Sequence, residues 1–300
     1  MHIWFLRLTW VSLPFIAGVA ASDAVSGWST PTRAVAATLL WVAWGSGLVA
    51  ALAPRPVSLT VLRTVAPLFV VVSALVVVGA DDVAAIAGIG ALAVVVVNAA
   101  LALSPATAMA CAAGAAYGTE VRHPLKVPPA LLSAPAPIAV GLVGAGVAAG
   151  PLLLGARAWV LGAVLTPVGF AVAALLARSL HTLSRRCAVL VPAGLVLIDP
   201  MTLADPVLFT RETVTNLGLT ARLASADTDT VDLRTGAILR SLEITSREPV
   251  PLARALAGRR GAALTSARRV LFAPVRPGSL LRVARARRMA VTDITATPRH

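Results

Sequence analysis

The chain contains 300 residues, of which 58% are hydrophobic and 13% charged, and its mean hydropathy is +0.85. This composition lies outside the range of soluble globular proteins and indicates a membrane protein. The formal net charge of +13 belongs mostly to the C-terminal part, because 18 arginines and only nine acidic residues follow Arg178. We therefore expect a basic surface there, close to something anionic.

Six apolar stretches in residues 1–178 predict a transmembrane helical domain, because a membrane-spanning helix needs about 20 consecutive apolar residues. The predicted spans are residues 8–21, 34–53, 64–80, 83–103, 137–156 and 159–177. The first also resembles a secretory signal peptide, with Arg7 before an apolar core and small residues after it. We favour an uncleaved anchor. Residues 104–118 suit an interfacial or re-entrant piece better than a seventh span.

The charged residues between these spans predict the orientation of the chain, because cytoplasmic loops are enriched in Lys and Arg. With an inner N-terminus, the inner segments carry Arg7, Arg55, Arg63, Arg122, Lys126 and the Arg-rich C-terminal part. The outer segments carry Asp23, Arg33, Asp81, Asp82 and Arg157. This bias predicts a multi-pass protein of the cytoplasmic membrane with its C-terminus in the cytosol.

Polar groups are scarce within the predicted spans. Asn98 is the clearest one, and it either lines a pathway or makes an interhelical hydrogen bond, which is the commoner use. Gly146 and Gly150 form a G-x-x-x-G pattern that predicts close helix packing. The spans place no Asp, Glu, Lys or Arg at mid-membrane depth, which argues against an ion-coupled transporter.

The inner loop that follows the fourth span reads YGTEVRHPLKVPP from Tyr117 to Pro129. It is a candidate contact site between the membrane part and the cytosolic part. The residues that carry this prediction are Tyr117, Glu120, Arg122 and Lys126. The alternative is a solvated connector that holds ordinary positive-inside charge.

Residues 185–290 change to a β pattern and predict a separate cytosolic domain, followed by a flexible tail at 291–300. CAVLV (187–191) and LVLID (195–199) read as two strands about a turn. TVDL and ILRSLEI, on either side of residues 234–236, predict a second hairpin. A short helix and loop are expected at 251–261, a last strand at 270–274, and a last helix at 277–289.

This order of short strands closed by one helix resembles the PH-like barrel, including the membrane-tethered PH-like domains of bacteria. The string VPAGLVLIDPMTLADPVLF after the last span, with AYGTEVRHPLKVPP in the preceding loop, is similar to an uncharacterised family of multi-pass membrane proteins from high-GC Gram-positive bacteria. The resemblance implies a helical bundle followed by an α+β domain with a PH-like barrel. It implies no catalytic residues.

The basic surface is expected on the last helix and in the segment before it. Arg282, Arg285 and Arg288 lie three residues apart and share one helix face, with Arg287 beside them. Further pairs are Arg259, Arg260, Arg268 and Arg269. Anionic lipid headgroups or a protein are the expected partners, with a solvated face as the alternative. Nucleic acid is not expected, because no aromatic residues are interleaved with these arginines.

Catalytic and cofactor motifs are missing from the sequence. There is no H-E-x-x-H, G-x-S-x-G or P-loop pattern, and the two cysteines are in no C-x-x-C pairing. We therefore expect no enzymatic activity, no cofactor and no metal site. The leading hypothesis is a non-enzymatic scaffold or regulator that contacts the membrane surface or a protein partner. The alternative is a small permease or a transporter subunit.

Overall fold

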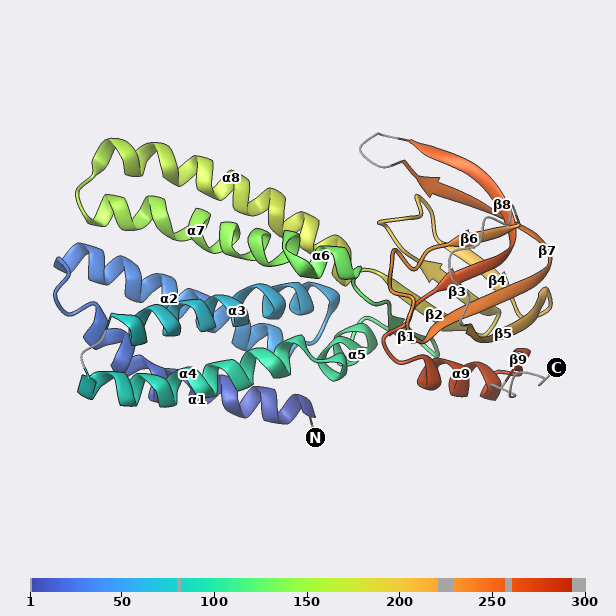
Figure 1. The fold of residues 1–300 in the computed structure, drawn as a ribbon, viewed down its shortest axis with the longest axis horizontal. Helices are drawn as coiled ribbons and strands as arrows, with labels where there is room; N and C mark the ends of the chain where they lie inside the picture. Colours follow the sequence, from blue (N-terminus) through green and yellow to red (C-terminus); the bar gives the residue numbers. More distant parts are fainter. Residues whose placement is uncertain (1, 80–81, 221–228, 257–260, 293–300) are drawn as a thin grey trace. The chain divides into compact units, whose positions relative to one another are not determined.

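The computed structural model describes residues 2–79, 82–220, 229–256 and 261–292 (Figure 1). The chain forms two compact units. The helical unit comprises Met1–Gly114 and Pro135–His181, and the β unit comprises Ala115–Ala134 and Thr182–His300. The loop after the fourth predicted span therefore belongs to the β unit, together with the C-terminal part of the chain.

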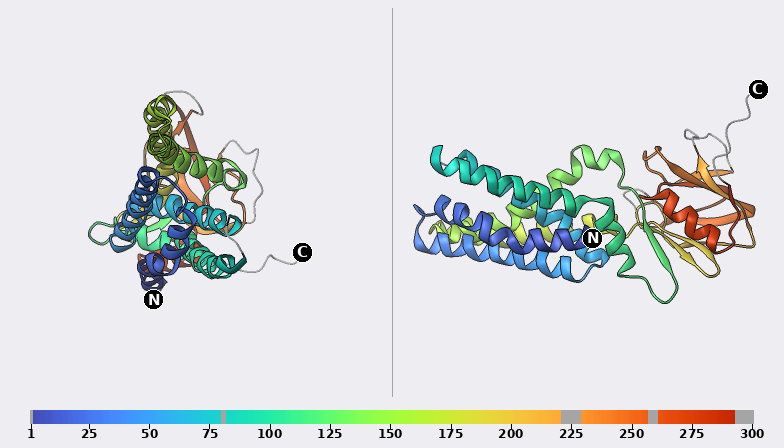
Figure 2. Two further views of the ribbon diagram at one scale, coloured as in Figure 1. Left: turned by 90° about the vertical axis from the view of Figure 1, so that its left-hand side faces the viewer. Right: turned by 90° about the horizontal axis from the view of Figure 1, so that it is seen from below.

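The helical unit contains α1 (His2–Ala24), α2 (Thr30–Leu52), α3 (Pro56–Val78), α4 (Asp82–Leu103), α5 (Pro105–Ala113), α7 (Pro135–Gly155) and α8 (Trp159–Ser184). Five of these, α1, α2, α3, α7 and α8, are long and apolar enough to cross a membrane. The α4–α5 pair, bent by 51°, brings the total to six if it counts as one span. Figures 1 and 2 show α1 to α4 packed together along their lengths.

The break between α4 and α5 has a local cause. Pro105 has no backbone N–H and disfavours helical geometry in the residue before it. Ser104 accordingly has an extended backbone and caps α5, its hydroxyl accepting a hydrogen bond from the Thr107 amide at 3.2 Å. Within residues 104–118, expected to be an interfacial or re-entrant piece, residues 105–113 form this short helix after the bend.

The predicted close packing of the G-x-x-x-G helix is confirmed. A Cβ atom on Gly146 would come within 2.6 Å of the Gly169 carbonyl oxygen, and one on Gly150 within 2.5 Å of the Thr166 backbone nitrogen. Only glycine allows α7 and α8 to approach this closely.

The β unit contains two sheets. One consists of β1 (Val121–Pro124), β2 (Cys187–Val191), β3 (Gly194–Ile198) and β4 (Val207–Thr210), in that order and all antiparallel. The other has the order β6-β8-β7-β5-β9, with β5 (Val214–Thr220), β6 (Thr230–Asp232), β7 (Ser241–Ala255), β8 (Ala262–Phe272) and β9 (Val291–Thr292). The short helix α6 (Pro129–Ser133) and the helix α9 (Pro277–Ala286) complete the unit.

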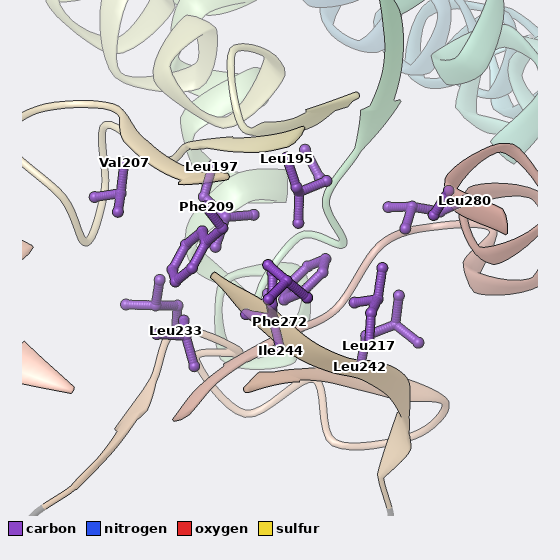
Figure 3. Close-up of a cluster of buried hydrophobic side chains, with 14 of the residues drawn as sticks. Leu195, Leu197, Val207, Phe209, Leu217, Leu233, Leu242, Ile244, Phe272 and Leu280 are labelled. Atoms are coloured by element: carbon purple, nitrogen blue, oxygen red, sulfur yellow. The ribbon is translucent and has the colours of Figure 1, made fainter. Parts of the chain in front are cut away.

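Apolar side chains from the two sheets meet in one core. Leu195, Leu197 and Phe209 from the first sheet face Ile244 and Phe272 from the second (Figure 3). All five are fully buried. The predicted strands at 187–191 and 195–199 are confirmed as β2 and β3, and the predicted last helix is confirmed as α9. Across the described residues the strands form two sheets and no closed barrel, so the barrel itself is not confirmed.

The predicted hairpin across residues 234–236 is wrong. β6 pairs in parallel with β8, and residues 233–240 form turns instead of a strand. Alternation predicts one buried face for this hairpin, made of Val231, Leu233, Ile238, Leu242 and Ile244. Four of these residues are buried, but Ile238 is 38% exposed. Alternation therefore identified most inward-facing residues but not the partner strand, because strand pairing also depends on contacts distant in sequence.

The predicted helix at 251–261 is also wrong over its first residues, because β7 continues to Ala255. β5 pairs with β7 only as far as Ser246, so β7 is an edge strand beyond that point. Pro251 is tolerated there because an edge strand needs no donor from it. Further along, the loop at residues 202–204 pairs with this edge, since the Ala204 amide donates to the Ala253 carbonyl and the Ala255 amide donates to the Thr202 carbonyl. Of the predicted tail, Val291 and Thr292 form β9, and residues 293–300 lie outside the described residues.

Candidate functional site

A buried ion pair between Arg186 and Asp199 lies where the two pieces of the β unit meet. The guanidinium donates from Nε to Asp199 Oδ1 at 2.8 Å and from Nη2 to Oδ2 at 2.7 Å. Its Nη1 donates to the carbonyl of Lys126 at 2.9 Å, and the Arg186 carbonyl accepts from the Leu125 amide at 3.0 Å. Both side chains are almost completely buried. Arg186 therefore attaches the inner-loop segment to β2 and β3.

A second arginine is also internal. Arg234 is 1% exposed and donates to both oxygens of Asp232, at 2.9 and 2.6 Å, and to Ser241 Oγ at 3.3 Å. Burial raises the pKa of Asp232, but the hydrogen bonds and charge of Arg234 outweigh burial, and the pKa lies below its ordinary value. Arg186 and Arg234 are thus structural residues, although a charge count assigns them to the basic surface.

Helix α9 presents a basic face. Its inward side buries Leu280, Leu281 and Ala284 against the core. Its outward side exposes Arg282 and Arg285. The prediction that Arg288 shares this helix face is wrong, because α9 ends at Ala286 and Arg288 lies, also exposed, in the turn that follows, with a φ of 59°. We refer to these three arginines as the basic face. Arg287 turns instead toward the inner-loop segment, where its Nη2 donates to the Thr119 carbonyl.

The other predicted basic residues lie elsewhere. Arg268 is exposed, with its Nε 3.6 Å from Asp229 Oδ2, and Arg269 donates to Thr230 Oγ1 at 3.0 Å. Both are on β8, separated from the α9 side of the sheet by β7 and β5. Arg259 and Arg260 lie outside the described residues. The predicted basic residues therefore do not form one patch.

The four predicted inner-loop residues have different surroundings. Glu120 Oε1 accepts from the Tyr117 amide at 2.6 Å and from Arg122 Nε at 2.9 Å, which closes the loop on itself. Lys126 Nζ donates to the Leu239 carbonyl at 2.5 Å. Tyr117, in contrast, is 88% exposed. The segment therefore folds as part of the β unit, and Tyr117 is its most exposed predicted contact residue.

His123 is buried in β1 without a polar partner. It is fully buried, and neither ring nitrogen has a hydrogen-bond partner among the described residues. Burial lowers its pKa to about 4, so the ring is neutral at physiological pH. The described part of the chain also contains no group of three potential metal ligands.

In the helical unit, two tryptophans connect α1 and α2 by hydrogen bonds. Trp10 Nε1 donates to the Trp44 carbonyl and Trp44 Nε1 donates to the Trp10 carbonyl, each at 2.9 Å. The Trp10 ring lies directly on Gly47, where a Cβ atom would be 1.8 Å from Trp10 Cζ2. The ring also meets Phe69 of α3 edge to face. The sequence contains these aromatic residues but does not reveal their two reciprocal hydrogen bonds, because the partners are 34 residues apart.

Asn98 lies in this packed region. It is 1% exposed and its Nδ2 donates to Thr9 Oγ1 of α1 at 3.2 Å. This is the interhelical hydrogen bond, the commoner of the two uses considered. Trp44 also lines a cavity of about 540 Å³ in the helical unit, and Asn98 is not among the residues that line it.

Comparison with known proteins gives no relative. The chain matches no protein-family model, no curated protein and no solved structure. The function must therefore be argued from the residues, and the resemblance to a family of bacterial membrane proteins stays a prediction.

Replacing Gly47 with alanine is expected to destabilise the helical unit, because the methyl group would overlap the Trp10 ring. Overpacking of this kind costs about 1–3 kcal/mol. The thermal unfolding temperature of the detergent-solubilised chain measures the effect. Gly45→Ala is the matched control, since no atom lies within 4 Å of a Cβ there. Equal unfolding temperatures for the two variants would contradict the packing.

Replacing Arg186 with methionine is expected to destabilise the β unit by about 3–5 kcal/mol, because Asp199 would be left as a buried, unpaired charge. Protease cleavage within residues 115–134 should then become faster, because the hydrogen bond from Arg186 to the Lys126 carbonyl is lost. The exposed neighbour provides the control: Arg185→Met should change stability by less than about 0.5 kcal/mol. Similar protection of the segment in both variants would argue against this hydrogen bond.

Acidification should destabilise the β unit through His123. Its folded pKa of about 4 lies below the unfolded value of 6.5, so the stabilisation is complete above pH 6.5 and is lost as the pH falls toward 4. The loss is at most about 3 kcal/mol. Unfolding temperatures between pH 7.5 and 4.5 should fall less steeply in His123→Phe than in the parent chain. Parallel curves for the two proteins would reject this.

Proposed function

We propose that the protein is a non-enzymatic scaffold or regulator of the cytoplasmic membrane whose β unit, on the cytosolic side, holds anionic lipid headgroups through the basic face. The observation that carries the proposal is the geometry of α9. One side is anchored in the core by Leu280, Leu281 and Ala284. The other exposes Arg282 and Arg285 one turn apart, and Arg288 is exposed in the turn that follows the helix.

The orientation of the chain is supported by the helical unit. His2 contacts Ser104, Arg7 donates to the Ala51 carbonyl, and Thr60 contacts His181. These contacts gather the predicted inner segments at one end, which carries Arg7, Arg55, Arg63 and Arg178. Gly155 packs against Thr32 at the opposite end, near Asp23 and Arg33. Such a bias favours a cytosolic location for the end where the chain leaves for the β unit.

Lipid contact is supported by the charge and by the aromatic residue nearby in the fold. Each arginine near an anionic leaflet gains about 1 kcal/mol, within a Debye length of roughly 10 Å. Arg287 links α9 to the loop that exposes Tyr117, and tyrosine is enriched at membrane interfaces. Tyr117 follows Gly114, the last residue of the helical segment, by three residues, a reach of about 10 Å. The element order resembles that of a PH-like domain, but the proposal depends on charge and not on that resemblance.

A solvated face is the alternative reading of the same arginines, because cations late in a helix also suit its dipole. The two readings differ in their dependence on lipid charge and salt. A lipid-binding face responds to both, and a solvated face responds to neither.

A dye on α9 distinguishes these readings in the full chain. Gly278→Cys offers an exposed labelling site with no atom within 4 Å of its Cβ, while Cys111 and Cys187 are buried. We expect the emission of an environment-sensitive dye to shift in anionic nanodiscs relative to neutral ones, and the shift to shrink with salt. Replacing the basic face by glutamine (R282Q, R285Q and R288Q) should remove about 1 kcal/mol per residue.

The control removes the same charge from other exposed positions, Arg211, Arg240 and Arg247. This R211Q, R240Q and R247Q variant should keep the shift. Equal emission of the parent chain in neutral and anionic nanodiscs at low salt would reject lipid contact.

A permease for polar solutes is not favoured. That alternative calls for a polar cavity, whereas the cavity in the helical unit has mostly apolar walls and Asn98 does not contribute to it.

A further inference from the structure

The cavity in the helical unit results from small residues on three helices. α1 contributes Ala17 and Gly18, α2 contributes Ala36 and Ala37, and α4 contributes Ala91. Their short side chains leave a space of about 540 Å³ that larger residues would fill. This volume lies in the range of about 300–1,000 Å³ that is typical of ligand sites.

The walls of the cavity suit a hydrocarbon chain. Its larger lining residues are apolar or aromatic: Leu13, Leu40, Trp41, Trp44, Phe69, Val72, Val76 and Val95. The Trp10–Trp44 hydrogen bonds fix the position of Trp44. The ligand therefore meets preformed walls on the side of α1 and α2.

Polar groups in the lining are few: Ser22, Asp23, Arg33 and Ser73. Asp23 lies at the end of α1 and Arg33 in the first turn of α2, at the end of the unit opposite Arg7. Both side chains are exposed, and neither forms an ion pair with any other described residue. One carboxylate and one guanidinium at the cavity complement a headgroup that carries both a cation and an anion.

We propose that this cavity binds an aminophospholipid, with an acyl chain between α1, α2, α3 and α4, the phosphate at Arg33 and the ammonium group at Asp23. In a bilayer, an acyl chain gains little by moving from lipid tails to an apolar wall, because the two environments are equally apolar. Selectivity therefore comes from the headgroup. Arg33 and Asp23 decide which lipid is held, and the small residues decide whether a chain fits.

The test uses the full chain in phosphatidylglycerol nanodiscs that contain a minor amount of phosphatidylethanolamine with a photoactivatable diazirine on its acyl chain. Peptide mass spectrometry locates the cross-links. We expect labelling of Leu40 and Phe69, which are half-buried, to exceed that of Val160 and Leu161, which are exposed apolar residues on α8. A phosphatidylglycerol probe with the same diazirine should label the cavity less.

Gly18→Leu is the variant that fills the cavity. Gly18 lines the cavity and no atom lies within 4 Å of a Cβ at this position, so a leucine side chain can begin there without displacing a neighbour. We expect cavity labelling to fall by about fivefold, which corresponds to ~1 kcal/mol. Gly141→Leu on α7 is the matched control, because its Cβ also meets no atom within 4 Å and it does not line the cavity. An unchanged unfolding temperature verifies that both variants are folded.

Asp23→Asn and Arg33→Gln test the headgroup contact. Each should reduce the preference for the phosphatidylethanolamine probe by about fivefold, while labelling by the phosphatidylglycerol probe persists at its lower level. Equal labelling of the cavity and of α8 would indicate surrounding bilayer lipid only and would overturn the inference. Insensitivity to Gly18→Leu, or equal labelling by both probes in the parent chain, would overturn it too. These results are independent of the α9 experiment, which involves other residues and another lipid.

Discussion

The β unit depends on the buried guanidinium of Arg186. Asp199 neutralises its charge, and its remaining N–H groups reach the carbonyls of Lys126 and Leu233, which lie far away in the chain. Removing both charges from water is costly, and only a geometry that satisfies the guanidinium offsets this cost. Here two carboxylate oxygens and the Lys126 carbonyl accept from it. Residues 115–134 and the segment after His181 are therefore parts of one folded body, and the chain passes between the two units three times.

The inner loop is a folded part of the β unit and not a solvated connector. β1 extends the first sheet by pairing with β2, and Leu125 contributes to the core. The Thr119 carbonyl accepts from Arg287, next to the basic face. The inner loop is therefore a structural part of the β unit.

Local patterns in the sequence predicted much of the fold. Long apolar runs identified the helices that are long enough to cross a membrane, and β-branched runs about Pro192–Gly194 identified β2 and β3. Arginine spacing identified the exposed side of α9 at Arg282 and Arg285. The small residues Gly146 and Gly150 also revealed close helix packing. In each of these cases, neighbours in the sequence determine the structure, so a short window contains the necessary information.

Other features depend on partners distant in the chain and could not be predicted this way. The parallel pairing of β6 with β8 and the edge position of Pro251 require knowledge of the whole sheet. The burial of Arg186 and Arg234 could not be predicted without knowing their hydrogen-bond acceptors. Taken by itself, an arginine in a short stretch of sequence is expected at the surface. The cavity arises from small residues on separate helices, and no single helix reveals it.

Accessibility of two introduced cysteines tests the central claim, a membrane bundle with the β unit on the cytosolic side. Gly27→Cys lies between α1 and α2 and Gly278→Cys on α9, both exposed, whereas Cys111 and Cys187 are buried. A membrane-impermeant maleimide should label Gly27→Cys in intact cells and Gly278→Cys only after permeabilisation. Labelling of Gly278→Cys in intact cells, with Gly27→Cys protected, would contradict the account.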